Sequence, residues 1–247
     1  MATDIRTALD PTLLAERLGL TLDDWQRRVL VERPRRGLWC AARQIGKTTT
    51  ALITTLWTLL YEAPALCLIV SPSLRQSTEA FRSLMLMYHK LDNVPEARTE
   101  SATRAEFVNG SRVVSLPGTE KTIRGYAGAK LIVCDEAARI EDSLMSAIRP
   151  MLGTSGGSLI MLSTPAGKRG EFFRAWSEGG PEWVKVRVPA SECGRLSPEF
   201  LAEEKRELGP LRYAEEYELA FNEADEAVFS SAMIDRAFTD AVRPLWG

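Results

Sequence analysis

The sequence predicts an α/β fold with a mostly parallel central sheet, and three observations lead to this prediction. Short apolar runs such as 66–70 and 131–134 contain no alternating polar residues, which is typical of strands buried on both faces. Segments with helical periodicity separate these runs along the chain. The resulting order of strand, loop, helix, strand, helix, strand and strand is that of a doubly wound sheet.

Each element is predicted from its own local pattern. Apolar residues at helical spacing predict helices at 13–20, 23–31, 48–61, 76–91, 198–208 and 210–221. Continuous apolar runs predict buried strands at 37–42, 66–70, 131–134 and 159–162. Residues 183–188 alternate between apolar and polar side chains, so we expect an edge strand there. The pair Asn109-Gly110 within 107–114 predicts a tight hairpin turn, because it supplies positive φ angles.

The composition limits the class of protein. A chain of 247 residues fits one large domain or one domain with a small appendage. The formal net charge is −2, so contact with nucleic acid requires a local basic patch. Four cysteines without a CxxC spacing and a single histidine argue against a zinc site and a disulfide framework, and favour a reducing, intracellular setting. The N-terminus lacks the pattern of a signal peptide, and we expect no membrane span.

The segment 42–48 carries the motif with the clearest chemistry. It ends in Gly46-Lys47-Thr48 and lies between an apolar strand and a well-formed helix. In a Walker A loop, G-x-x-x-x-G-K-[ST], the glycine permits close approach, the lysine contacts phosphate oxygens and the hydroxyl binds magnesium. The helix that follows favours anions at its N-terminus. Ala41 replaces the first glycine of the motif, and the alternative interpretation, a surface turn, is disfavoured by the flanking strand and helix.

The nucleotide-binding residues predicted in this loop are Arg43, Gln44, Ile45, Gly46, Lys47, Thr48 and Thr49. Arg43 adds a second cation beside the γ-phosphate, where it would neutralise charge during catalysis.

An acidic pair, Asp135-Glu136, follows the apolar run 131–134. This run places both carboxylates at the carboxyl end of a strand, where α/β sheets bind ligands. We expect Asp135 to hold magnesium through water and Glu136 to act as the general base for the attacking water. A solvated acidic pair at the start of a loop is the alternative, which the phosphate loop upstream disfavours. Together the two motifs predict a nucleotide hydrolase of the P-loop class that uses ATP and Mg²⁺.

Three further polar residues are candidates for contact with the nucleotide. Ser163 and Thr164 follow the apolar run 159–162, where either hydroxyl would hydrogen-bond the γ-phosphate or the attacking water. An ordinary strand-to-loop transition has the same pattern, so both interpretations stay open. Gln26 follows Trp25 ahead of the first strand, at a place where a glutamine reads adenine in many translocases. The alternative for Gln26 is a polar residue on the surface of a helix.

Arg139 lies three residues after Glu136 and is a candidate arginine finger, which would complete the active site of a neighbouring subunit. The alternative is a surface ion pair with Glu141 or Asp142. Other candidates for the same role are Arg43, Arg104, Arg124 and Arg169. A locally basic set would either follow a nucleic-acid backbone or form solvated surface, and its members are Arg98, Arg104, Arg112, Lys121, Arg124 and Lys130.

A change in composition near residue 190 predicts the domain organisation. The chain becomes helical and charged from Pro198 onward. We therefore expect residues 1–190 to form a P-loop ATPase core, and residues 191–247 to form a small C-terminal helical lid and the start of a linker.

The ordered set of motifs resembles the large terminase subunit of tailed bacteriophages, specifically its N-terminal ATPase domain. The resemblance extends from about residue 20 to about residue 230, and the arginine in the phosphate loop is its most specific feature. The segments that carry it are Trp25-Gln26, Arg43-Gln44-Ile45-Gly46-Lys47-Thr48, Ile69-Val70-Ser71-Pro72, Arg124-Gly125, Cys134-Asp135-Glu136-Ala137-Ala138, Leu162-Ser163-Thr164-Pro165-Ala166-Gly167 and 218–229.

The resemblance implies a P-loop NTPase of the additional-strand, catalytic-glutamate type. It implies a motor that hydrolyses ATP to move double-stranded DNA into a procapsid, docked on that procapsid in the host cytoplasm. The implied partners are a portal protein and a small terminase subunit, and the implied assembly is a ring homo-oligomer, which we expect to be a pentamer. By the same resemblance Glu136 is the catalytic base, Lys47 and Thr48 bind phosphates and metal, and Ser163-Thr164 couple hydrolysis to movement.

One departure from the family concerns the end of the chain. Family members usually continue into a ribonuclease-H-like nuclease, whereas this chain ends at Gly247, so we expect an ATPase domain without DNA-cleaving activity. Two rival functions are a fragment of a superfamily 2 helicase-like translocase and a nucleotide-gated DNA-binding module. A second arginine-bearing domain, which the helicase needs, is not evident after Thr164. Glu136 disfavours the binding module, because a protein that only binds nucleotide does not need a second carboxylate.

Overall fold

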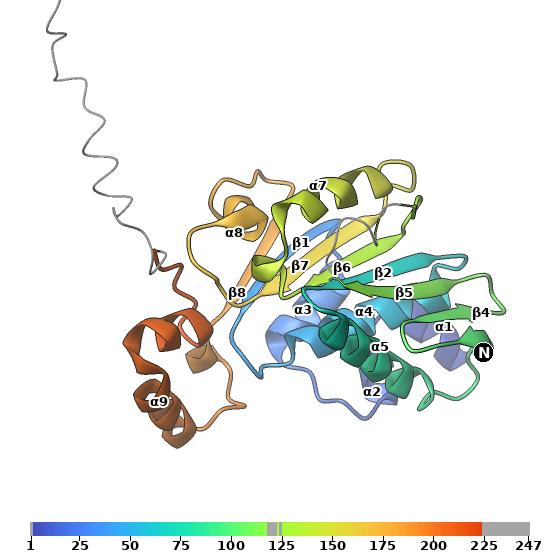
Figure 1. The fold of residues 1–247 in the computed structure, drawn as a ribbon. Coiled ribbons are helices and arrows are strands. Elements are labelled where there is room, and N and C mark those ends of the chain that lie inside the picture. Colours follow the sequence, from blue (N-terminus) through green and yellow to red (C-terminus); the bar gives the residue numbers. More distant parts are fainter. Residues whose placement is uncertain (1, 118–122, 124, 224–247) are drawn as a thin grey trace, which may run out of the picture.

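The computed structural model of the protein describes residues 2–117, 123 and 125–223. Its strands are β1 (Arg36–Ala41), β2 (Leu66–Ser71), β3 (Ala97–Glu100), β4 (Arg104–Phe107), β5 (Arg112–Pro117), β6 (Leu131–Asp135), β7 (Ser158–Ser163) and β8 (Val184–Val188). Together they form an eight-stranded sheet in the order β3-β4-β5-β2-β6-β7-β1-β8 (Figure 1). Residues 224–247 of the predicted lid, and with them the second half of the segment 218–229, lie outside the described residues.

The sheet is mostly parallel, which confirms the predicted fold class. Every pairing from β5 to β8 in this order is parallel, whereas β4 is antiparallel to both of its neighbours. The strand β8 lies at one edge, as the alternating pattern of 183–188 predicts. The strand β7 lies between β1 and β6, so the strand before the phosphate loop and the strand before the acidic pair are not neighbours. An inserted strand at this place defines the additional-strand type.

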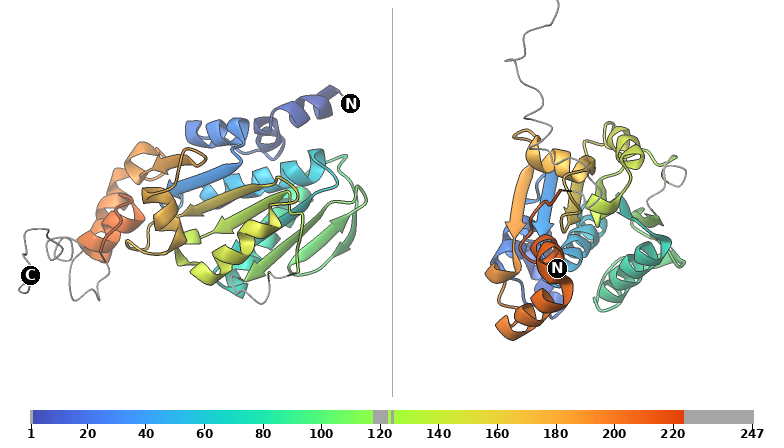
Figure 2. Two further views of the ribbon diagram at one scale, coloured as in Figure 1. Left: turned by 90° about the horizontal axis from the view of Figure 1, so that it is seen from above. Right: turned by 60° about the vertical axis from the view of Figure 1, so that its left-hand side comes forward.

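Helices cover both faces of the sheet. They are α1 (Ala2–Leu9), α2 (Thr12–Arg17), α3 (Asp24–Glu32), α4 (Lys47–Tyr61), α5 (Leu74–Tyr88), α7 (Asp142–Met151), α8 (Gly170–Ser177) and α9 (Pro198–Glu216), with short 3-10 turns η1 (Ala137–Arg139) and η2 (Ala190–Glu192). The helices from α1 to α5 lie on one side of the sheet, and α7 and α8 lie on the other (Figures 1 and 2). The helix α9 lies beyond the edge of the sheet that β8 forms.

Local hydrogen bonding accounts for most differences between predicted and observed helix bounds. The helix α5 begins at Leu74, earlier than predicted, because the hydroxyl of Ser73 accepts a hydrogen bond from the Gln76 N–H and caps the first turn. The two helices predicted after Pro198 are present as two parts of α9, which break at Gly209 with φ 72°. The second part ends at Glu216, five residues earlier than predicted. The helix α1 was not predicted.

The hairpin between β4 and β5 is present, but its turn differs from the prediction. Gly110 has a positive φ of 84°, whereas Asn109 does not adopt one. Asn109 acts through its side chain, which accepts a hydrogen bond from the Ser111 N–H at 2.9 Å and donates one to the Leu59 carbonyl at 2.9 Å. The turn is therefore a four-residue loop fixed by an asparagine side chain, in place of a two-residue turn with two positive φ angles.

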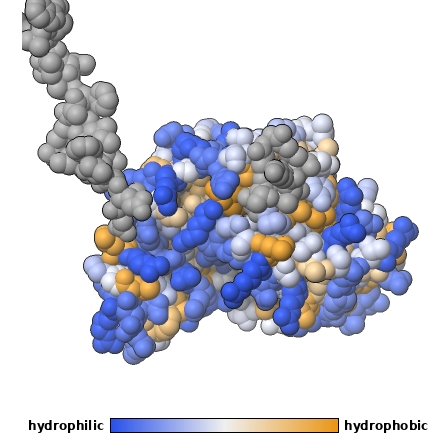
Figure 3. Space-filling model, in the orientation of Figure 1, coloured by the Kyte–Doolittle hydropathy of each residue, from blue (hydrophilic) through white to orange (hydrophobic). Residues whose placement is uncertain are grey.

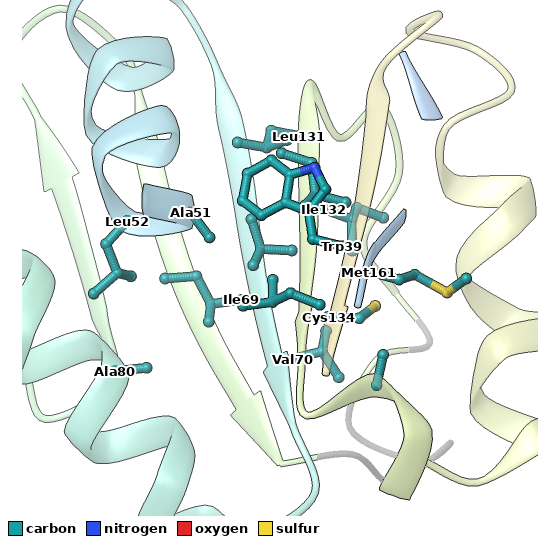
Figure 4. Close-up of a cluster of buried hydrophobic side chains, with 14 of the residues drawn as sticks. Trp39, Ala51, Leu52, Ile69, Val70, Ala80, Leu131, Ile132, Cys134 and Met161 are labelled. Carbon is teal, nitrogen blue, oxygen red and sulfur yellow. The ribbon is translucent and has the colours of Figure 1, made fainter. Parts of the chain in front are cut away.

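The core consists of apolar side chains between the sheet and its helices. Figure 4 shows members of this core from β1, β2, β6, β7, α4 and α5, including Trp39, Ile69, Ile132, Met161, Leu52 and Ala80. Figure 3 shows a mostly hydrophilic surface on one face, with hydrophobic residues in small separate patches. The four cysteines are buried and unpaired. Among the described residues, no helix is long and apolar enough to cross a membrane.

The buried centre of β2 leads to a prediction about stability. Leu68 is fully buried, so Leu68→Ala should lower the free energy of unfolding by about 3–5 kcal/mol through lost burial and a residual cavity. The matched control is Leu86→Ala on α5, where the side chain is 56% exposed and the change should stay within about 0.5 kcal/mol. Urea denaturation followed by circular dichroism measures both. Equal effects of the two changes would contradict the assigned position of β2.

Candidate functional site

The phosphate loop connects the end of β1 to the start of α4. Gly46 precedes the helix with φ 84°, and Gln44 also has a positive φ, of 60°. A β-carbon at position 46 would lie 2.6 Å from Nε2 of Gln26, so only glycine fits this place without displacement. Ile45 is fully buried and anchors the middle of the loop, while Arg43 and Gln44 are exposed. The first N–H groups of α4 therefore point to the carboxyl edge of the sheet, where an anion is favoured.

The structure brings the phosphate loop and the acidic pair together at this edge. The Lys47 ammonium lies 3.4 Å from Oε1 of Glu136, although all the strands from β2 to β6 lie between the two residues in sequence. Lys47 is 7% exposed, so its charge is largely removed from water. Thr49 follows in the first turn of α4 and is partly buried. The predicted juxtaposition of lysine and glutamate is thus present.

Thr48 and Asp135 form the second contact between the two motifs. The Thr48 hydroxyl lies 3.2 and 3.1 Å from the two Asp135 carboxylate oxygens, to which it donates. Burial, followed by the negative charge of Glu136, raises the pKa of Asp135 to about 6, and Lys47 and hydrogen bonds from Thr48 and the Glu136 N–H oppose this shift. An aspartate held near a hydroxyl at a site that penalises its charge is suited to a magnesium ion.

This pair fits magnesium better than a metal that needs many protein ligands. In the described part of the chain no three His, Cys, Asp or Glu side chains are grouped so as to hold a metal. Magnesium typically uses one or two protein ligands together with phosphate oxygens and water. The residues present fit that requirement.

Glu136 is held in a restricted position by its backbone and by three side chains. Its φ is 53°, in the left-handed region that non-glycine residues seldom adopt. Its Oε2 accepts a hydrogen bond from Arg139 at 2.9 Å and lies 3.5 Å from the Ser163 hydroxyl. Since Lys47 lies against Oε1, both carboxylate oxygens have cationic neighbours in this arrangement.

Arg139 connects the acidic pair to two other parts of the protein. Its Nη1 donates to Glu136 and to the Thr164 hydroxyl at 3.2 Å, and its Nη2 donates to Glu216 at 3.2 Å. The side chain is 37% exposed. The alternative expectation, an ion pair with Glu141 or Asp142, is wrong for the described residues, since Asp142 pairs instead with Arg174 of α8.

Ser163 and Thr164 lie at the carboxyl end of β7, immediately beside the acidic pair. Asp135 pairs in register with Leu162, so the next residue of β7 is adjacent to Glu136. Ser163 and Thr164 are almost fully buried, and each contacts a charged residue of the site. The inserted strand thereby brings two hydroxyls to the catalytic glutamate and its arginine.

Gln26 lies next to the loop, but its amide is fully engaged by the protein. Nε2 donates to the Gly46 carbonyl at 3.3 Å and to the Thr50 hydroxyl at 2.9 Å. Oε1 accepts hydrogen bonds from the Asp23 N–H at 2.9 Å and from Arg195 at 3.0 Å. Gln26 is 2% exposed, which excludes the alternative of a helix surface residue. Its adenine-reading role stays a prediction, and in this arrangement the amide braces the loop.

Two residues of this region were missed by sequence reasoning. Glu216, the last residue of α9, pairs with Arg139 and lies 3.7 Å from Nε of Arg43, whose N–H also donates to the Glu216 carbonyl. Arg195 contacts Gln26 from the segment before α9. Both come from a charged helical region in which no spacing marks one residue among its neighbours.

The other candidate arginines lie elsewhere or outside the described residues. Arg104 is exposed on β4, which β5 and β2 separate from β6. Arg169 is the residue that precedes α8 and is exposed. Arg124, like Lys121, lies outside the described residues. Of the basic set, Arg98, Arg104 and Arg112 are exposed on the three strands from β3 to β5, with Glu100 and Glu106 among them, so this surface carries mixed charge.

The phosphate loop, the inserted strand and the glutamate that follows the aspartate define a P-loop NTPase of the additional-strand type. Residues 38–236 match the family described as terminase large subunit, T4likevirus-type, N-terminal. This match covers more than half of the chain, which therefore belongs to that family. No functionally curated protein matches the chain.

Solved structures of phage large terminases share the fold. The ATPase domain of the large terminase of Thermus phage P74-26 superposes with a TM-score of 0.75 and 21% identity, over 84% of this chain and 96% of that one. The HK97 bacteriophage large terminase has a TM-score of 0.67 and 18% identity, over 82% of this chain and 50% of that one. The large terminase of a thermophilic bacteriophage, solved in complex with ADP, has a TM-score of 0.63 and 14% identity, over 85% and 53%. This chain spans about half the length of the last two.

The raised pKa of Asp135 leads to a prediction about stability and pH. Because the pKa of about 6 exceeds the ordinary value of 3.8, the folded protein binds more protons than the unfolded chain between about pH 4 and about pH 6. Its stability therefore falls as pH rises through this window. Asp135→Asn removes the effect, so in metal-free buffer it should be more stable than the wild type at pH 7, by at most about 3 kcal/mol.

Urea denaturation at a series of pH values measures this difference. It should shrink as pH falls towards about 4, where Asp135 is protonated in both states. A difference that does not change with pH would show that the carboxylate of Asp135 is not disfavoured in the folded protein.

Proposed function

We propose that this protein hydrolyses ATP to move double-stranded DNA into a viral procapsid, as the ATPase domain of a large terminase. The convergence of Lys47 and Thr48 with Glu136 and Asp135 carries the proposal. These are the groups needed to bind a triphosphate, hold its metal and orient a water molecule. Family membership supports the same activity, and relatives of this fold have been solved with ADP and with ATP-γ-S.

Binding of ATP would rearrange the contacts of Glu136. The γ-phosphate would compete for the Lys47 ammonium, which now lies against Oε1. Arg139 would then have to leave Oε2 for the carboxylate to accept a proton from the attacking water. Magnesium would be held by Thr48 and Asp135 and, when bound, would neutralise charge on the phosphates. Arg43, exposed on the loop, would turn from Glu216 to the γ-phosphate.

Arg139 is proposed to act on the active site of a neighbouring subunit. Its guanidinium is more than one third exposed and is held within its own subunit by Glu136, Thr164 and Glu216. Release from these acceptors would free it to reach an adjacent γ-phosphate. An arginine supplied in this way stabilises the charge that develops in the transition state.

Ser163 and Thr164 are proposed to couple hydrolysis to movement. Ser163 contacts Glu136 and Thr164 contacts Arg139, which also pairs with Glu216 of α9. A change at the γ-phosphate would therefore be passed to the lid, proposed to comprise residues 191–247 after a core of 1–190. Movement of this lid against the core would shift the DNA.

The proposed assembly is a pentameric ring that docks on the procapsid in the host cytoplasm. Its proposed partners are double-stranded DNA, a portal protein and a small terminase subunit, and membership of the large-terminase family supports them. The proposal covers ATP hydrolysis and assigns DNA cleavage to no residue of this chain.

Glu136→Gln tests the assignment of the general base. The amide keeps the size of the side chain but does not accept the proton, so turnover should fall by about 10²–10⁴-fold while ATP binding persists. Phosphate release and calorimetric titration with ATP measure the two quantities. Turnover close to that of the wild type would refute the assignment.

The same phosphate-release assay, run on the wild type with and without double-stranded DNA, tests the function against its two rivals. A packaging ATPase should be stimulated by duplex DNA, a helicase-like fragment should prefer single strands, and a binding module should release no phosphate above background. Either of the last two results would overturn the proposal.

Arg139→Ala tests the role in trans. In an assembled ring the change should lower turnover by about 10³-fold or more, because the developing charge loses a cation. In dilute monomer the same change should have a small effect. Arg104→Ala on β4 serves as the matched control and should have little effect in either state. An equal loss in monomer and ring would show that Arg139 acts within its own subunit.

A further inference from the structure

A residue of the proposed lid lies against the phosphate loop on the side away from Glu136. Arg195 follows η2 and precedes α9 in sequence. Its Nε donates to Asp23 Oδ2 at 2.6 Å, and its Nη2 donates to the Thr21 carbonyl and to Gln26 Oε1, both at 3.0 Å. The guanidinium is thus fixed by three acceptors that precede or begin α3.

These contacts leave one end of the guanidinium without a partner. Three of its five N–H donors are engaged, and no described residue accepts a hydrogen bond from Nη1. Nη1 lies 3.7 Å from the position that a β-carbon on Gly46 would occupy. The side chain of Arg195 is 37% exposed, so a ligand can reach Nη1 from solvent. Two free donors of a fixed cation therefore face the phosphate loop.

The direction of the triphosphate decides which part of the nucleotide lies near these donors. The γ-phosphate must lie beside Glu136, because that residue is proposed to activate the attacking water. Lys47 reaches Glu136, whereas Gly46, one residue earlier, faces Gln26 and Arg195. The α-phosphate and the nucleoside therefore extend towards Arg195. A planar, permanently charged guanidinium with two free N–H groups matches the oxygens of a phosphate.

We propose that Arg195 is a nucleotide-binding residue of the lid, whose Nη1 donates to a non-bridging oxygen of the α-phosphate. The inference rests on the proposed nucleotide site and adds a contact common to ATP and ADP. The lid would then be held to the core by any bound nucleotide through Arg195. The γ-phosphate would be sensed separately, at Arg139.

Calorimetric titration of the full chain with ADP and with ATP-γ-S, in the presence of EDTA, tests the proposal. Arg195→Ala should weaken both nucleotides by a similar factor, about 10- to 100-fold for the loss of a charged hydrogen bond. Arg195→Lys keeps the charge but lacks the fork, so its loss should be smaller. The control is Arg206→Ala, an exposed arginine of α9, which should leave both affinities unchanged. Unchanged affinities in Arg195→Ala, or a loss for ATP-γ-S alone, would overturn the proposal.

A second measurement separates contact from a merely structural role. The two diastereomers of adenosine 5′-(α-thio)diphosphate place sulfur at one or the other non-bridging α-position. The ratio of their affinities should change in Arg195→Ala and stay at the wild-type value in Arg206→Ala. If the ratio is the same in all three proteins, Arg195 only holds the lid and the inference fails. If the wild type binds neither ADP nor ATP-γ-S, the proposed function fails first.

Discussion

The ion pair between Lys47 and Glu136 is the contact on which the rest of the site depends. A lysine ammonium that is 7% exposed needs an opposite charge, because an unpaired buried charge is strongly destabilising. The phosphate loop supplies the cation and the end of β6 supplies the anion. The sheet must therefore bring the carboxyl ends of β1 and β6 close enough for this pair, and the parallel strand order does so. A triphosphate would replace one partner of an existing pair.

The inserted strand β7 connects this pair to the remainder of the molecule. Its register places Ser163 beside Glu136 and Thr164 beside Arg139. Arg139 in turn reaches Glu216 at the end of α9, which also pairs with Arg43 of the phosphate loop. Acidic and basic groups alternate along this path, so a change in the charge near Glu136 alters which partner each arginine prefers. Electrostatic competition of this kind is the means by which nucleotide state would reach the lid.

Much of the fold and part of the site were predictable from local sequence. The strands at 66–71 and 131–135 were predicted almost to the residue, because continuous apolar runs and the polar residues that end them are local signals. The turn at Asn109 was predicted in place but not in kind, since the asparagine side chain bonds Leu59, a residue distant in sequence. Gln26 was recognised by its position, yet its burial and its bonds to Gly46 and Thr50 depend on how α3 packs on α4.

The sequence by itself determined the chemistry: a glycine–lysine–threonine loop after a buried strand, and an aspartate–glutamate pair after another, in a family recognised from their order. Only the tertiary structure decided which strand separates them, that Arg139 meets Glu216, and that Arg195 reaches Gly46. The physical reason is range. Motifs and buried strands are encoded by neighbouring residues, whereas strand order and contacts between lid and core are set by the simultaneous packing of distant segments, for which no local pattern exists.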